Sequence, residues 1–148
     1  MYLYRLPIYQ VRLVRDGSQR SNLKKIVKPT DVTEILNAFL TGVDRENFVV
    51  IMLNTKNQII GINTVAIGML SSCPVHPREV FKPVILANAA GVILGHNHPS
   101  GEPSPSQDDL ALTNRLRDAG ELLGIPVIDH IIIGDEGRFY SFKEHSYF

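Results

Sequence analysis

A short apolar segment that ends in a glycine and two histidines constrains the fold of this chain more than any other feature. Residues 91–94 form a continuous apolar run, which is typical of a buried strand, and Gly95 directly precedes His96 and His98. If the extended backbone continues to Asn97, alternate side chains lie on one face of the strand. The sequence therefore predicts that both imidazoles project to the same side.

A helix is predicted to begin close to these two histidines. Residues 99–105 contain three prolines and one glycine, which disfavour any continuation of the strand. Ser106 is a typical helix N-cap, and Asp109 is the third residue of a helix predicted over residues 107–123. The carboxylate of Asp109 is therefore expected to point back toward the end of the strand.

Two imidazole nitrogens and one carboxylate oxygen are the ligand set of a catalytic zinc ion, which keeps a fourth position for water. We predict Zn²⁺ as the cofactor and His96, His98 and Asp109 as its ligands. The alternative is that the histidines are polar loop residues and that Ser106 and Asp109 are only a capping pair. The strand before the histidines and the capped helix after them favour the metal site.

The composition indicates an ordinary globular protein with a single domain. The chain has 148 residues, of which 44% are hydrophobic and 20% charged, and its 15 basic residues balance its 15 acidic ones. The molecule therefore lacks the strong positive field of a dedicated nucleic-acid-binding protein. Residues 12–28 are locally basic, and we interpret them as a solvated connector rather than a binding arm.

The cellular setting follows from what the sequence lacks. Cys73 is the only cysteine, which excludes an intrachain disulfide, and we interpret it as a loop or core thiol. The N-terminal residues show no apolar core of a signal peptide, and no later segment approaches the length of a membrane span. We expect the cytoplasm and no membrane partner.

The remaining patterns predict one α/β domain. Strands are expected over residues 8–14, 47–53, 58–67, 91–95, 127–133 and 138–142, and helices from a capping box at Asp31, over residues 77–90 and over residues 107–123. Pro83 should distort the second helix. Residues 1–28 are expected to form an N-terminal strand and basic linker, and residues 29–148 the domain itself.

The spacing of the candidate ligands resembles a known motif. One residue separates His96 from His98, Pro99 follows directly, six residues then precede Ser106, and two more precede Asp109. The pattern resembles the JAMM (MPN+) metalloprotease motif. Residues 96–101, together with residues 105–106 and 129–134, are similar to the RadC family within that superfamily. The resemblance extends from about Pro29 to the end of the chain. It implies that residues 29–148 form a JAMM/MPN-like RadC domain, with a mixed β-sheet flanked by helices.

The same resemblance implies an activity and its catalytic residues. A zinc-dependent hydrolase of this type cleaves a peptide or isopeptide bond with metal-activated water and a glutamate as the general base. Glu46, at the start of the strand after the first helix, has the expected place, and Glu79 and Glu102 are the alternatives. Ser106 is implied as a hydrogen-bond donor to the developing oxyanion. Asn97 replaces the serine or threonine usual in deubiquitinating relatives, so the eukaryotic isopeptide substrate stays open.

Two functions other than a zinc-dependent hydrolase are compatible with the same residues. One is a DNA-associated repair or binding factor with a structural or vestigial metal site, for which basic residues 12–28 are the only local support. Another is a non-haem iron site, which shares the ligand set but fits the spacing less well. The pair Asp129 and His130 is interpreted as structural, because strand alternation puts the two side chains on opposite faces. The expected partner is a peptide or protein substrate, and the oligomeric state is open.

Overall fold

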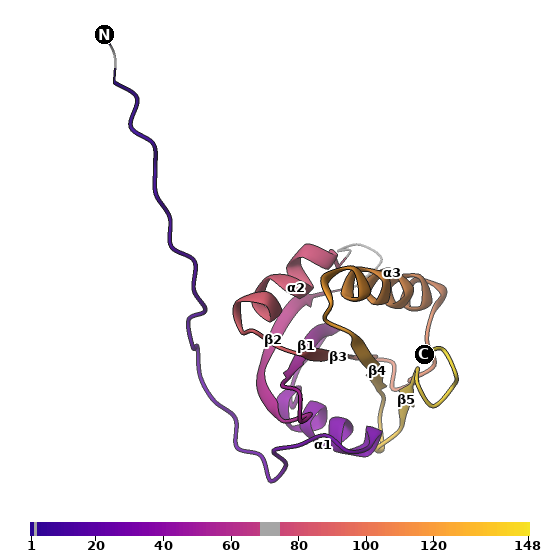
Figure 1. The fold of residues 1–148 in the computed structure, drawn as a ribbon. Coiled ribbons are helices and arrows are strands. Elements are labelled where there is room, and N and C mark those ends of the chain that lie inside the picture. Colours follow the sequence, from indigo (N-terminus) through magenta and orange to yellow (C-terminus); the bar gives the residue numbers. More distant parts are fainter. Residues whose placement is uncertain (2, 69–74) are drawn as a thin grey trace.

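A mixed sheet of five strands forms the centre of the molecule (Figure 1). The computed structural model describes residues 1, 3–68 and 75–148. The strands are β1 (Asn47–Leu53), β2 (Ile59–Ile67), β3 (Gly91–Asn97), β4 (Val127–Ile133) and β5 (Phe139–Ser141). They lie in the order β2-β1-β3-β4-β5, in which β3 and β4 are parallel and the other neighbours antiparallel. Strand β3, which carries the first candidate ligand, is therefore the central strand.

Helices cover both faces of this sheet. Helix α1 (Pro29–Phe39) lies on one face, and α2 (Pro77–Leu86) and α3 (Gln107–Leu123) lie on the other (Figure 1). The predicted fold class is thereby confirmed: a single α/β domain whose mixed sheet is flanked by helices. Within the described residues, no helix combines the length and apolar character that a membrane span requires.

Strand β1 shows how the sequence builds this arrangement, because all seven of its residues are buried. Phe48, Val50 and Met52 belong to the apolar cluster beneath α2 and α3. The alternate residues, of which Val49 and Ile51 are examples, belong to the cluster beneath α1. A strand covered on both faces needs apolar residues at every position, which explains the continuous apolar run.

Helix α1 begins three residues earlier than predicted. The capping-box interpretation made Asp31 the N-cap, but the helix begins at Pro29, and Asp31 is its third residue. The carboxylate of Asp31 accepts hydrogen bonds from the backbone N–H groups of Val27 (2.9 Å) and Lys28 (3.0 Å). Proline is favoured at the first helical position because it has no N–H to satisfy there, and the prediction missed this signal.

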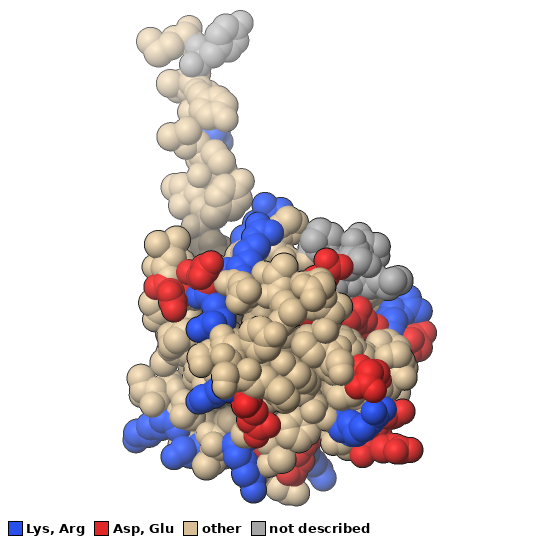
Figure 2. All heavy atoms as spheres, turned by 90° about the vertical axis from the view of Figure 1, so that its right-hand side faces the viewer, with Lys and Arg blue, Asp and Glu red and all other residues tan. Residues whose placement is uncertain are grey.

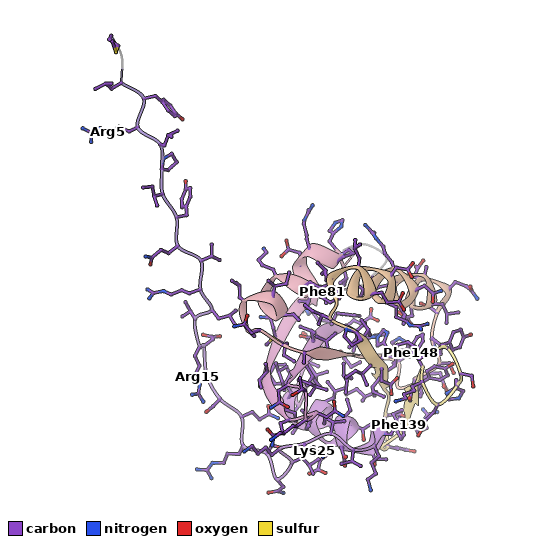
Figure 3. All side chains as sticks on the ribbon, in the orientation of Figure 1. Arg5, Arg15, Lys25, Phe81, Phe139 and Phe148 are labelled. Carbon is purple, nitrogen blue, oxygen red and sulfur yellow. The ribbon has the colours of Figure 1, made fainter. Side chains whose placement is uncertain are left out.

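Helix α2 ends at Leu86, four residues before the predicted end. Asn88 adopts a left-handed conformation with φ of 53°, which is incompatible with a continuing helix. Pro83 lies inside the helix. The ring of Phe81 packs between α2 and α3 (Figure 3). A Cβ added to Gly120 on α3 would lie 3.3 Å from this ring. Val84 is fully buried, whereas Ile85 beside it is 50% exposed.

The N-terminal segment stands apart from the domain. Residues 3–22 are exposed throughout, and the segment extends away from the body with Arg5 and Arg15 along it (Figure 3). The strand predicted over residues 8–14 is not formed, since none of the described residues 3–22 belongs to a strand. Pairing begins only at Lys25, which forms a bridge with Gln58. The division at residue 28 stays a prediction, and Cys73 lies outside the described residues.

Candidate metal centre

Four titratable side chains converge at the end of the central strand. Glu46, His96, His98 and Asp109 each offer a ligand atom, and these atoms all lie within 4.8 Å of one another. Glu46 immediately precedes β1, and the antiparallel pairing of Phe48 with His96 brings the start of β1 beside the end of β3. The fold therefore assembles residues from three separate parts of the chain.

The two histidines face the same side because β3 continues through Asn97, two residues beyond the predicted end of the strand. His96 Nε2 lies 3.1 Å from His98 Nε2. The ring of His96 is fully buried, whereas the side chain of His98 is 15% exposed. The strand alternation assumed from the sequence thus accounts for the position of both rings.

The first turn of α3 presents the carboxylate. Ser106 Oγ accepts a hydrogen bond from the backbone N–H of Asp109 (3.0 Å), and Asp109 Oδ2 accepts one from the N–H of Ser106 (2.9 Å). This reciprocal capping box fixes the side chain of Asp109. Its Oδ1 lies 3.3 Å from His96 Nε2 and its Oδ2 lies 3.1 Å from His98 Nε2. The carboxylate of Asp109 therefore caps the helix and faces both histidines at the same time.

The spacing of these atoms suits a small tetrahedral cation. Zinc binds nitrogen and oxygen ligands at about 2.0–2.1 Å, so the ligands of a tetrahedral zinc site lie about 3.3 Å apart. The nitrogen and oxygen atoms of His96, His98 and Asp109 are separated by 3.1 to 3.3 Å. Glu46 Oε1 is farther away, at 3.8 Å from each histidine nitrogen. Three residues therefore fit as ligands, and Glu46 lies beside them.

Hydrogen bonding within the cluster controls its charge. Burial by itself raises the pKa of Asp109, but hydrogen bonds from His96 and His98 outweigh burial and hold it well below its usual range. The hydrogen bond to Asp109 raises the pKa of His98, and burial only partly opposes this effect. Asp109 is therefore an anion at neutral pH, as a metal ligand must be.

A backbone carbonyl orients His98. The carbonyl oxygen of Glu102 lies 2.7 Å from His98 Nδ1, and because a carbonyl only accepts, this nitrogen is the donor. The Nε2 atom is thereby directed at the cluster. The carboxylate of Glu102 turns elsewhere, toward Ser104 (3.0 Å) and Arg138 (3.1 Å).

Glu46 is the one glutamate of the three candidates that lies in the cluster. Glu79 forms an ion pair with Lys82 at 3.1 Å on α2, and Glu102 points away from the histidines. The side chain of Asn97 secures the backbone on both sides of Glu46: its Oδ1 accepts from the N–H of Asn47 (2.7 Å) and its Nδ2 donates to the carbonyl of Arg45 (3.1 Å). The residue between the two histidines therefore positions the start of β1.

His130 is the residue of this site that sequence reasoning missed. It was interpreted as structural, which its buried hydrogen bonds do not contradict, and its Nε2 lies 2.8 Å from His96 Nδ1. Burial lowers the pKa of His130 well below its usual range, so the ring is neutral. Asp129 points to the other side, as predicted, and accepts a hydrogen bond from Ser141 (2.7 Å). The motif at residues 129–134 was a signal for His130, but only the parallel pairing of β3 with β4 reveals the contact.

Comparison with known proteins places this geometry in a family. The model of the RadC-like JAB domain matches residues 26–147. Among curated relatives, a UPF0758 protein of Moorella thermoacetica is 54% identical over 82% of this chain and 52% of its own length. UPF0758 proteins of Rubrobacter xylanophilus and Methanosarcina acetivorans are 52% and 47% identical over 81% and 84% of this chain, and over 52% and 54% of their own lengths. The chain thus spans about half the length of these relatives, and it belongs to the family of RadC-like JAB domains.

Proposed function

We propose that this domain is a zinc-dependent metallopeptidase that cleaves a peptide or isopeptide bond. The observation that carries the proposal is the position of the Glu46 carboxylate, 3.8 Å from both histidine nitrogens and beside a ligand set of tetrahedral spacing. His96, His98 and Asp109 would hold the zinc ion, and the chemistry that zinc would supply there is activation of water and polarisation of the scissile carbonyl. Iron shares this ligand set, and metal analysis distinguishes the two.

Glu46 is assigned as the general base. Its carboxylate accepts a proton from the attacking water and delivers it to the departing amine. The side chain is 17% exposed, so it can exchange protons with a substrate at the surface while its backbone is fixed by Asn97. A base held in this way needs little reorganisation during the reaction.

Ser106 is assigned to the developing oxyanion. Its oxygen accepts the hydrogen bond of the Asp109 N–H, and a hydroxyl group also carries one proton that it can donate. The capping role and the catalytic role therefore use different parts of the same group. Removing one such donor typically lowers the rate by about 10²–10³-fold.

The proposed substrate is a peptide or protein, and the proposed compartment is the cytoplasm, since a chain with one cysteine needs no oxidising environment. Exposed basic residues within 12–28 are the only support for the DNA-associated alternative. Acidic and basic side chains are interspersed on the face of the domain drawn in Figure 2, and such a surface does not concentrate positive charge for phosphate contacts.

The test combines zinc content with hydrolysis of fluorescein-labelled casein and a panel of quenched fluorescent peptides. Asp109→Ala should lose zinc, whereas Glu46→Gln should keep zinc and lose hydrolysis. Glu102→Gln is the matched control, because its carboxylate lies outside the cluster, and it should retain both properties. Full activity of Glu46→Gln would show that the assigned base is wrong, and a zinc-loaded wild type that cleaves no probe would count against the peptidase.

A further inference from the structure

A chain of three buried hydrogen bonds leads from His96 away from the metal centre and back to the backbone of Asp109. His96 Nδ1 lies 2.8 Å from His130 Nε2, and His130 Nδ1 lies 2.6 Å from Thr113 Oγ1. The hydroxyl of Thr113 donates to the carbonyl oxygen of Asp109 at 2.7 Å. His96 and His130 are fully buried and Thr113 is 1% exposed, so water does not compete for these bonds.

The carbonyl of Asp109, at one end of this series of hydrogen bonds, determines the position of every proton in it. Because a carbonyl only accepts, the single proton of Thr113 is used there, and its oxygen must accept from His130 Nδ1. A neutral His130 with its proton on Nδ1 has a lone pair on Nε2, which accepts from His96 Nδ1. His96 therefore carries a proton on Nδ1, and a metal ion on Nε2 would replace the proton that this nitrogen donates toward Asp109 in the metal-free protein.

The opposite tautomer of His130 would be unfavourable. It would direct the lone pair of Nδ1 at an oxygen whose proton is already committed to Asp109, at a separation of 2.6 Å. Two acceptors at that distance repel each other, and a buried acceptor without a donor is destabilising. The chain of bonds thus has one consistent direction.

We propose that Thr113 and His130 are positioning residues that hold His96 in the tautomer whose Nε2 faces the metal. The inference rests on the proposed metal binding and deepens it, since neither residue belongs to the ligand set. The relay also joins three elements: His96 on β3, His130 on β4 and Thr113 on α3, with its last acceptor on Asp109 itself. It therefore links two ligands that come from different elements.

The tautomer of His98 is fixed in the same way, but by one hydrogen bond instead of three. Its Nδ1 donates directly to the carbonyl of Glu102 at 2.7 Å. Metal-binding histidines generally donate their second ring nitrogen to such an acceptor, which fixes the tautomer and the ring orientation. His96 Nδ1 instead faces His130 and reaches a carbonyl through two side chains. Both histidines thereby direct Nε2 at the same point.

Aromatic packing keeps the relay in place. The ring of Phe48 is stacked on His96 with centroids 5.7 Å apart, and the ring of Phe142 is stacked on His130 at 4.7 Å. Phe48 and Phe142 are fully buried. Close packing of this kind prevents either imidazole from rotating out of the hydrogen-bonded arrangement.

The first test reads the tautomers in the zinc-loaded protein. Long-range ¹H–¹⁵N NMR spectra of the imidazole nitrogens at pH 8 should show His96 and His130 both protonated on Nδ1. This result is independent of substrate, so it holds even if the domain cleaves nothing. A proton on Nε2 of His130 would overturn the proposal.

The second test compares two variants of the hydroxyl. Thr113→Val keeps the shape of the side chain but removes the hydroxyl, so His130 loses its anchor and zinc affinity should fall by about 10–100-fold. Thr113→Ser is the matched control, because it keeps the hydroxyl, and should bind zinc nearly as tightly as wild type. Affinity is measured by competition with a chromogenic chelator, on protein shown to be folded by circular dichroism. Wild-type affinity and unchanged tautomers in Thr113→Val would contradict the relay.

Discussion

At the scale of single residues, the pairing of His98 with Asp109 makes metal binding depend on pH. The hydrogen bond to Asp109 raises the pKa of His98 above 6.5, against the opposing effect of burial. A metal must displace the proton that His98 carries below this pKa, so zinc affinity should rise about tenfold per pH unit until the raised pKa is passed. Chelator competition between pH 6 and 8.5 measures this slope. An affinity that stops rising below pH 6.5 would contradict the expected sign of the shift.

Asn97 supports a second prediction at this scale, because its side chain holds the backbone on both sides of Glu46. Asn97→Ala removes both hydrogen bonds without touching a candidate ligand. We expect hydrolysis to fall by about 10-fold or more, since a misplaced base costs rate, while zinc affinity stays unchanged. Asn37→Ala, at an exposed position of α1, is the control. Equal loss of zinc and activity would indicate that Asn97 supports the ligands instead.

The candidate ligands could be predicted from sequence because they follow one another closely and each depends on local geometry. Strand alternation places His96 with His98, and a capping box places Asp109. His130 could not be placed in this way, because its contact with His96 depends on which strands pair. Glu46 was assigned only through a resemblance to a family, and the adjacency of β1 and β3 explains its position.

At the scale of elements, the N-terminus of α3 combines a structural role with the catalytic role proposed for Ser106. Ser106→Ala should lower the free energy of unfolding by about 1 kcal/mol, because the first turn loses its cap, and it should also lower hydrolysis. Ser106→Thr keeps the hydroxyl and should restore most of both. Urea denaturation and the peptide assay report the two effects separately. An alanine variant with wild-type activity would remove Ser106 from the catalytic residues.

The close contact of β3 with α1 provides a test of packing. A Cβ added at Gly95 would lie 2.7 Å from Leu36 Cδ2, within the core. Gly95→Ala should therefore destabilise the protein by about 1–3 kcal/mol through overpacking. Combining it with Leu36→Val, which removes bulk at the contact, should cost less than the two single changes added together. Strict additivity in urea denaturation would show that this contact does not limit the substitution.

Predictions for elements were accurate where one strong local signal controlled a boundary. The bounds of β1, α3 and β4 agree with those predicted, and Gly124 ends α3 in the left-handed conformation, with φ of 72°. The end of α2, by contrast, was predicted four residues too late, because the left-handed conformation of Asn88 was not evident from the apolar periodicity.

At the scale of the whole molecule, the N-terminal segment and the domain should behave independently. Residues 3–22 are exposed, whereas Ile26 is 8% exposed and packs in the core beneath α1. Deletion of residues 1–20 should leave the melting temperature and zinc affinity unchanged. Deletion of residues 1–26 is the contrasting variant and should lower the melting temperature, because Ile26 and the Lys25 bridge are lost. A lower melting temperature after the shorter deletion would show that the segment packs on the domain.

The most direct test of the whole account is a crystal structure of the zinc-soaked protein with anomalous data collected on both sides of the zinc absorption edge. We expect one zinc peak among His96 Nε2, His98 Nε2 and the Asp109 carboxylate, with a water as the fourth ligand within hydrogen-bonding distance of Glu46. A fourth protein ligand in place of water, or no anomalous peak between the two histidines, would contradict the proposed catalytic metal centre.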